Sequence, residues 1–264
     1  MYSEFRIPRL AATLWRSEPE EPLDEAPAES LIVPDGCMDL IVLDAEVVVA
    51  GADSTARAFR GARQTAVGLR FDPGVLPQLL ATSAAELANA ITPLDAVTSL
   101  DAATPLDAAT SLDAVTPLDA VTPLDAITPL DAVTPLDAAT PLDSDGNSDR
   151  PVDRASRALL GTARMLADRT ELNPLPMAFA SSLRPSPSPS IAEAAEQFAY
   201  SPRQLRRLSA DWFGYGPKHL AKVLRWQAAR RLIAAGQTKT AAAAAAGYSD
   251  AAHLWRDEQA LLGR

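Results

Sequence analysis

The chain of 264 residues contains little of what catalytic and metal-binding proteins depend on. Cys37 is its single cysteine, which excludes an intrachain disulfide and indicates a reducing compartment. The two histidines, His219 and His253, lie far apart along the chain. The sequence also lacks a Cys/His metal spacing, a phosphate-binding glycine loop and a nucleophile elbow. We therefore expect no enzyme, no metal site and no cofactor.

Long apolar runs are missing as well. No uninterrupted apolar segment approaches the ~18 residues of a membrane-spanning helix, and Met1 to Arg6 are too polar for a signal peptide. These absences predict a cytoplasmic protein without a membrane partner. Asp35 and Asp39 flank Cys37, whereas low-pKa cysteines need an electropositive setting. The sequence therefore favours a buried structural thiol over a redox sensor.

The net charge of −10 argues against a nucleic-acid partner, but the charges are unevenly distributed. Residues 1–91 carry 7 basic and 14 acidic side chains, residues 92–149 carry none and 11, and residues 150–264 carry 17 and 9. Within the last part, residues 200–231 hold eight Lys or Arg against the single Asp211. This concentration of positive charge is typical of a phosphate-binding surface.

Two helix starts follow each other closely at the beginning of this basic region. Ser190 with Glu193, and Ser201 with Gln204, each form a capping box, and Pro202 stands at a first helical position. Helices are therefore predicted to begin at about residues 191 and 202. Their apolar residues recur at helical spacing, so the two stripes can pack together: Ile191, Ala194, Ala195 and Phe198 in the first, and Leu205, Leu208 and Trp212 in the second.

The second of these helices leaves four polar side chains for the solvent, namely Arg203, Gln204, Arg206 and Arg207. A helix-turn-helix unit pushes this part of its second helix into the major groove. Arginine can bind guanine there through two hydrogen bonds, and glutamine can bind adenine. The alternative is a solvated charged face on an ordinary helical hairpin.

The run SPRQLRRLSADWFGYGPKHLAKVLRWQ, from Ser201 to Gln227, resembles the first helix-turn-helix unit and linker helix of AraC/XylS-type transcription regulators. Gly214 and Pro217 stand at that family's turn. The resemblance implies two helix-turn-helix units, joined by a connecting helix over residues 218–235, that read successive major grooves of double-stranded DNA. The connecting helix would be buried through Leu220, Val223, Leu224, Ala228 and Leu232.

By the same resemblance, the second unit covers residues 238–262, with Gly247 at the turn, Ser249 as the N-cap and a reading helix that includes Ala251, Ala252 and Trp255. Lys239 and the six-alanine run 241–246 depart from the family and predict a poorly filled core. Ala199, at a turn position that is normally glycine, predicts a left-handed residue that costs about 1 kcal/mol. The implied DNA-binding residues of both units are Ser201, Arg203, Gln204, Arg206, Arg207, Lys218, Lys222, His253 and Arg256.

Residues 1–91 form short apolar runs separated by turn residues, and they predict a small β sheet or open barrel. The segments VPDGCMDLIV, VAGAD and VGLRFDPG resemble the cupin-like sensor domain that precedes some AraC-type DNA-binding domains. The resemblance implies that this domain binds a small-molecule effector or supports a homodimer. The predicted strands are Leu31–Val33, Leu40–Leu43, Val47–Ala50 and Ala66–Phe71, and Ser83 with Glu86 predicts a capped helix after them.

A repeat of six residues, Thr-Pro-Leu-Asp-Ala-Val, fills most of residues 92–149. Its prolines forbid a continuous helix and favour an extended acidic spacer, with a hexapeptide β-helix as the alternative. A short helical segment is predicted over residues 150–180, with apolar positions between residues 152 and 168. A Pro/Ser linker over residues 181–190 then predicts that the DNA-binding domain, residues 191–264, is tethered rather than packed against the rest.

The sequence thus predicts an α+β protein with a β-rich amino-terminal domain, a Pro/Asp hexapeptide-repeat spacer and an all-α carboxy-terminal domain. The leading hypothesis is a sequence-specific transcription regulator that reads DNA with the arginine-rich helix starting at Ser201. The alternative is an interaction or scaffold protein whose degraded helix-turn-helix domain does not read DNA and whose basic helices bind acidic partners.

Overall fold

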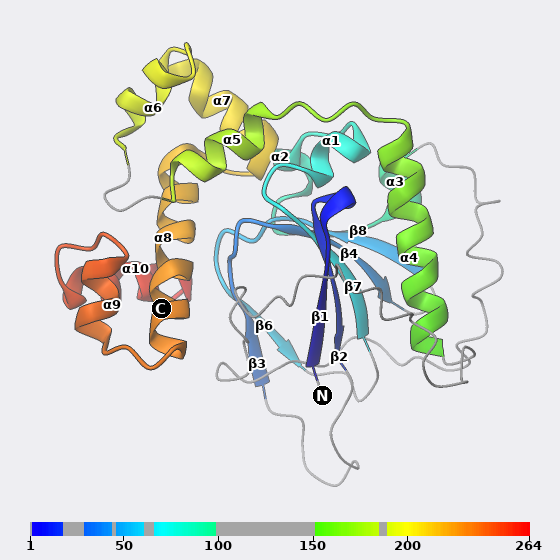
Figure 1. Cartoon of the computed structure of the whole chain (residues 1–264), viewed down its shortest axis with the longest axis horizontal. Helices are drawn as coiled ribbons and strands as arrows, with labels where there is room; N and C mark the ends of the chain where they lie inside the picture. The colour runs from blue at the N-terminus through cyan, green and yellow to red at the C-terminus, as the bar shows by residue number, and fades with distance from the viewer. Residues whose placement is uncertain (1, 18–28, 44–45, 61–65, 99–150, 185–188) are drawn as a thin grey trace, which may run out of the picture.

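The computed structural model describes residues 2–17, 29–43, 46–60, 66–98, 151–184 and 189–264. It confirms the α+β class, because strands fill the amino-terminal part and helices the carboxy-terminal part (Figure 1). The helices α6 to α10 form a group on the left of the view in Figure 1, beside the sheet.

A six-stranded antiparallel sheet forms the centre of the amino-terminal domain, in the order β1-β2-β7-β4-β5-β8. The remaining two strands pair only with each other. The strands are β1 (Tyr2–Ile7), β2 (Ala12–Ser17), β3 (Glu29–Ile32), β4 (Met38–Leu43), β5 (Glu46–Ala50), β6 (Arg57–Arg60), β7 (Ala66–Phe71) and β8 (Ile91–Pro93).

One row of apolar side chains sets the register of the sheet. Leu69 of β7 lies opposite Leu14 of β2 on one side and Leu40 of β4 on the other, and Leu40 lies opposite Val49 of β5. All four are buried. Because side chains alternate between the two faces of a strand, a shift by one residue would expose the whole row. The same alternation directs Arg70, the neighbour of Leu69, to the opposite face.

The four strands predicted from the sequence are present as β3, β4, β5 and β7. Strands β1, β2, β6 and β8 were not predicted. β1 and β2 are joined by a 3-10 turn, Pro8–Leu10, and by Ala11, which adopts the left-handed conformation at φ 46°. Turns of this kind normally use glycine or asparagine, so the local sequence carries no hairpin signal.

Three short helices lie at the end of the sheet that is at the top of Figure 1, and the long helix α4 (Pro151–Asp168) packs against β7 and β4. Leu159 and Ala163 are fully buried in this contact, and Arg16 of β2 pairs with Asp153 at 2.8 Å. The Ser83 hydroxyl caps α2 by accepting from the Ala85 N–H. The other helices of this part are α1 (Leu76–Leu80), α2 (Ala84–Leu87), α3 (Leu94–Val97) and α5 (Leu175–Ser182).

The first unit of the repeat, residues 92–97, completes β8 and forms α3. The other units lie outside the described residues, so the predicted spacer and the β-helix alternative fall there too. Leu94 of α3 and Leu159 of α4 belong to the same hydrophobic core. The repeat therefore connects α3 and α4, which pack in the same hydrophobic core.

The carboxy-terminal helices share that core with the sheet, so the predicted tether is wrong. Phe71 of β7, Leu76 of α1 and Phe213, at the end of one of the carboxy-terminal helices, are members of a single buried cluster. Phe179 of α5 contacts Phe198 and Phe213, with ring centroids 5.6 and 6.1 Å apart. The Pro/Ser composition of the linker predicted that the helices after it move independently of the rest. Instead, aromatic rings of α5, before the linker, pack against aromatic rings of the helices after it.

We predict that the bulk of the repeat can be removed without loss of the fold. Replacing residues 99–149 by a Gly/Ser linker of about 12 residues should raise the free energy of unfolding by about 1 kcal/mol, because a shorter loop loses less entropy on closure. Urea denaturation of the variant and the parent measures this difference. A destabilisation of about 2 kcal/mol or more would show that the repeat itself packs on the body.

Candidate nucleic-acid interface

The first helix pair begins at the two predicted capping boxes. In α6 (Ile191–Gln197) the Ser190 hydroxyl accepts from the Glu193 N–H at 3.2 Å, and the Glu193 carboxylate accepts from the Ser190 N–H at 2.7 Å. Ser201 and Gln204 exchange the same two bonds at the start of α7 (Pro202–Phe213). The two local signals thus place both helix starts as predicted.

Ala199 adopts the predicted left-handed conformation in the turn between these helices, at φ 56°. The turn is closed by the Tyr200 N–H, which donates to the Ala195 carbonyl at 2.8 Å. An alanine in this conformation is strained by about 1 kcal/mol relative to glycine. The packing of α6 on α7 keeps it there.

The two faces of α7 differ in character. Leu205, Ser209 and Phe213 are buried, and the Ser209 hydroxyl donates to the Tyr215 carbonyl at 2.8 Å. The opposite face is exposed over the first two turns. It carries the predicted contacts Arg203, Gln204, Arg206 and Arg207, beside the exposed N-cap Ser201.

Gln204 differs from the three arginines because its side chain already has partners. Its amide oxygen accepts from the Ser201 N–H at 2.9 Å and from the Ser201 hydroxyl at 2.8 Å. A two-bond contact with adenine needs both the oxygen and the nitrogen of the amide. Gln204 therefore acts as a cap in this structure, and the arginines form the exposed basic surface.

The connecting helix is α8 (Pro217–Ala234), which begins and ends one residue earlier than predicted. Leu220, Val223 and Leu224 are buried as predicted. The predicted core positions Ala228 and Leu232 are only half-buried, and Trp226 and Ala229 are buried instead. Trp226 was missed because it lies between the predicted positions, toward the second helix pair.

Two predicted contact residues, Lys218 and Lys222, lie on α8, in different settings. Lys218 is exposed. Lys222 is half-buried, with its Nζ 3.8 Å from the Asp257 carboxylate of α10. His219 is not a predicted contact, and it packs against Tyr215 with ring centroids 4.7 Å apart. Burial lowers the pKa of His219, and the nearby Lys222 adds to this shift.

The second helix pair comprises α9 (Lys239–Ala245) and α10 (Ala251–Leu261). The Thr238 hydroxyl caps α9, and Gly247 stands at the turn with φ 84°. The predicted N-cap Ser249 is wrong: Asp250 caps α10 by accepting from the His253 N–H at 2.6 Å. The two residues are adjacent, and a carboxylate accepts this bond more strongly than a hydroxyl.

The alanine core of α9 is filled from outside the helix. Ala242 and Ala243 are fully buried, together with Trp226 of α8 and Tyr248 of the turn. Asp257 of α10 accepts from Arg225 of α8 at 2.9 Å, and the Arg225 guanidinium lies 4.5 Å from the centre of the Tyr248 ring. Two large aromatic side chains and an ion pair thus replace the branched residues that α9 lacks.

The exposed surface of α10 is mixed in character. Arg256 and Ala252 are exposed, and the Arg256 Nε donates to the Ala252 carbonyl at 3.3 Å. Trp255 is the most exposed large apolar residue of the described chain, at 57%. His253 is half-buried, bonded to Ser249 and packed edge-on against Tyr248.

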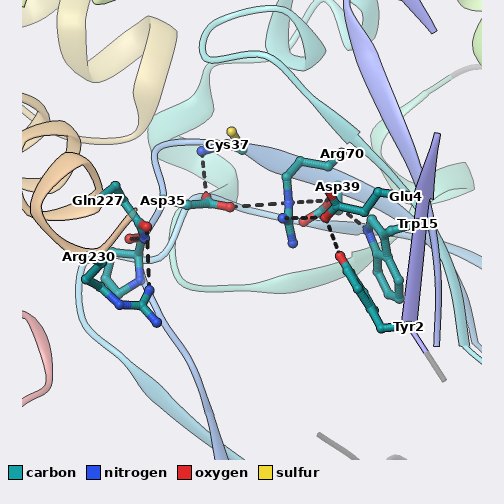
Figure 2. Close-up of polar contacts among 10 residues, drawn as sticks. Tyr2, Glu4, Trp15, Asp35, Cys37, Asp39, Arg70, Gln227 and Arg230 are labelled. Atoms are coloured by element: carbon teal, nitrogen blue, oxygen red, sulfur yellow. Dashed lines mark hydrogen bonds and ion pairs between the residues drawn. The ribbon is translucent and has the colours of Figure 1, made fainter. Parts of the chain in front are cut away.

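A second polar site, which the sequence did not predict, lies on the face of the sheet opposite the apolar row (Figure 2). Arg70 of β7 lies opposite Asp39 of β4, and its Nε is 3.4 Å from that carboxylate and 3.2 Å from that of Asp35. Trp15 donates to Asp39 at 3.1 Å. Glu4 of β1 lies 3.9 Å from Arg70. The only local signals for this cluster were the Asp-rich turn before β4 and an arginine inside an apolar strand.

The electrostatics of this cluster follow from its burial. Burial raises the pKa of Asp39 to about 6, although the Arg70 charge opposes this shift. Burial alone would lower the pKa of Arg70, but Asp39 and Asp35 raise it well above its ordinary value. The negative charge of Asp35 adds to the effect of burial, so proton uptake by Asp39 is favoured.

Cys37 lies in the loop before β4 and is partly exposed, with its N–H donating to the Asp35 carboxylate at 2.9 Å. Burial raises the pKa of its thiol well above the ordinary value, and Asp35 adds to this shift. A thiol of this kind is a poor nucleophile. This agrees with the structural role expected from the sequence.

Within the described residues, no three His, Cys, Asp or Glu side chains lie together in a way that could hold a metal ion. None of the helices in this part of the chain has the length and apolarity to cross a membrane.

Two families match parts of the chain. Residues 194–264 match a family described as a helix-turn-helix domain, and this match covers α7 to α10 with the end of α6. Residues 8–93 match a domain of unknown function (DUF6597), which ends with β8 where the repeat begins. No curated protein and no solved structure matches the chain.

We predict that Ala199→Gly raises the free energy of unfolding by about 0.5–1 kcal/mol, since glycine adopts the left-handed turn conformation without strain. Urea denaturation measures the change. Ala192→Gly, at an exposed position inside α6, is the matched control and should destabilise by a similar amount. Equal destabilisation by both variants would contradict the strain at residue 199.

The raised pKa of Asp39 predicts a pH-dependent contribution to stability. Its folded pKa of about 6 exceeds its unfolded value, so the folded state binds the proton more tightly and gains stability as the pH falls through 6. The unfolding free energy of the parent relative to Asp39→Asn should rise by about 1 kcal/mol from pH 7 to pH 5. The opposing effect of His219 cancels in this difference. An unchanged difference between the two pH values would show that Asp39 titrates normally.

Proposed function

Residues 194–264 belong to the helix-turn-helix family of AraC-type transcription regulators, and from this we propose that the chain is a sequence-specific DNA-binding regulator that reads DNA with α7. One observation carries the proposal: Arg203, Arg206 and Arg207 are exposed together on the first two turns of a helix whose other face is buried. A helix that enters the major groove needs one face packed on its own domain and the other face exposed to DNA.

Each exposed residue has a role that its chemistry supports. Arg206 and Arg207 are the base-reading residues, because a guanidinium can donate two hydrogen bonds to guanine. Arg203 and Lys218 bind phosphates, near the amino-terminal ends of α7 and α8 where the helix dipoles favour an anion. Ser201 and Gln204 preserve the start of α7 through the capping box.

The second helix pair contributes a weaker contact. Arg256 and its exposed neighbours on α10 bind the next major groove, and His253 supports the start of that helix beside the Asp250 cap. Lys222 acts through Asp257, holding α10 on α8, more than through DNA.

The amino-terminal domain is the sensor of this regulator. We propose that it adopts a cupin-like fold and binds a small effector or supports a homodimer, as in similar regulators. The protein acts by binding in the cytoplasm and not by catalysis. The rival function is a scaffold in which α7 and α8 bind acidic protein partners, and it predicts no preferred DNA sequence.

The test is DNA binding by full-length variants. On a duplex selected from a random pool, Arg206→Ala and Arg207→Ala should each lose about 5- to 150-fold in affinity, the equivalent of 1–3 kcal/mol per base contact. On random duplex the loss should be much smaller. Arg164→Ala, which removes an exposed arginine from α4, is the matched control for charge and should bind as the parent does. Titrations over a range of salt concentrations give the number of phosphates bound.

The outcomes separate the two functions. Equal, weak binding of every duplex by the parent favours the scaffold and overturns the proposal. Loss of affinity for selected and random duplexes alike would make these arginines phosphate contacts, and the assignment of base reading to them would be wrong.

A further inference from the structure

The amino-terminal domain holds the carboxy-terminal ends of both proposed reading helices. At the end of α7, the Ser83 hydroxyl donates to the Asp211 carboxylate at 3.1 Å. Gly214, which follows α7, lies so close to α2 that a Cβ there would be 3.0 Å from the Ala88 Cβ. At the end of α10, the Ala56 N–H donates to the Leu261 carbonyl at 2.7 Å.

The domain also contacts the middle of α8, between these two points. A Cβ on Gly36 would lie 3.5 Å from Leu220 and 3.6 Å from Leu224, so the loop before β4 rests on the helix. The Gln227 amide donates to the Pro34 carbonyl at 2.6 Å. Figure 2 shows Gln227 and Arg230 beside the loop that carries Asp35, on the side away from Arg70.

Gln227 is itself positioned by its neighbours on α8. Its amide oxygen accepts from Arg230 at 3.5 Å, and the Arg230 guanidinium lies 4.8 Å from the centre of the Trp226 ring. Burial lowers the pKa of Arg230. Trp226 in turn belongs to the core of the second helix pair, so the contact at Pro34 is continuous with the packing that orients α10.

The amino-terminal halves of the reading helices remain free of these contacts. Arg203, Arg206 and Arg207 of α7 are exposed, as are Ala252 and Arg256 of α10. The amino-terminal domain therefore contacts both helices at the ends that lie away from the proposed DNA contacts.

The geometry of DNA explains why these contacts can affect DNA binding. The 18 residues of α8 span about 27 Å, whereas successive major grooves on one face of DNA are about 34 Å apart. The helix pairs must project beyond the ends of α8, and their angles to it decide the distance between the two reading helices. Fixing these angles before binding lowers the entropy lost on binding.

We infer that the amino-terminal domain is a positioning part of the DNA reader, and that Gln227 and Ser83 determine which spacing of two groove segments the protein prefers. This inference rests on the proposed function. It assigns the junction a role in DNA specificity although none of its residues touches DNA.

The experiment uses full-length protein and three duplexes. The first is the duplex that the parent selects from a random pool, with its two groove segments located by footprinting. The other two carry one base pair inserted or removed between the segments. Gln227→Ala removes the bond to Pro34 together with the one from Arg230, and Ser83→Ala removes the bond to Asp211 together with the cap of α2. Gln237→Ala, at an exposed position after α8, is the matched control.

We expect Gln227→Ala and Ser83→Ala to bind the selected duplex about 10-fold more weakly and the two altered duplexes almost as the parent does. The preference for spacing thus falls, while Gln237→Ala retains it. A variant that is merely destabilised loses affinity for all three duplexes equally, and thermal unfolding measured in parallel identifies it. Two contacts at separate places keep the test informative if one variant folds poorly.

Two results would overturn the inference. Either both variants keep the parent's preference for spacing, or both lose affinity for all three duplexes alike. In each case the parent still selects one sequence, and the proposed function stands. If the parent selects no sequence at all, the proposed function itself fails.

Discussion

The close approach between the turn after α7 and the amino-terminal domain is the constraint on which the rest of the structure depends. Gly214 adopts φ +81°, and the residues facing it, Ala52, Ala84 and Ala88, are all small. A side chain at Gly214 would have to displace the Ala88 methyl group and accept a left-handed backbone. Because only backbone atoms and alanine methyl groups face Gly214, the two parts approach closely, and larger neighbours such as Phe213 complete one core shared by both.

A second constraint comes from half-buried charges beside the loop before β4, which contacts α8. The strand register brings Asp39 and Arg70 face to face, and the loop before β4 adds Asp35. The half-buried Arg70 guanidinium needs carboxylate partners. Burial, and to a lesser extent the charge of Asp35, raise the pKa of Asp39. The loop that carries Asp35 also touches α8 through Pro34 and Gly36. The loop of residues 34–36 therefore both supplies a carboxylate to Arg70 and positions the connecting helix α8.

Much of the candidate site could be predicted because its determinants are local. Capping boxes join residues three apart, and helical spacing separates Leu205, inside, from Arg206 and Arg207, outside. Short apolar runs separated by turn residues identified four strands. The packing of Trp226 against the alanines of α9 could not be predicted in this way. The residues that Trp226 packs with lie on later helices, and helical spacing relates only residues within one helix.

By itself the sequence determined where the helices of the reading unit begin, that Ala199 is left-handed and that the basic charge is concentrated in the last third. These properties depend on neighbours within one or two helical turns. Only the tertiary structure decided that Lys222 pairs with Asp257 and that the carboxy-terminal helices pack on the amino-terminal domain. Each of these depends on contacts between residues far apart in the sequence, which the spacing of residues along the chain does not specify.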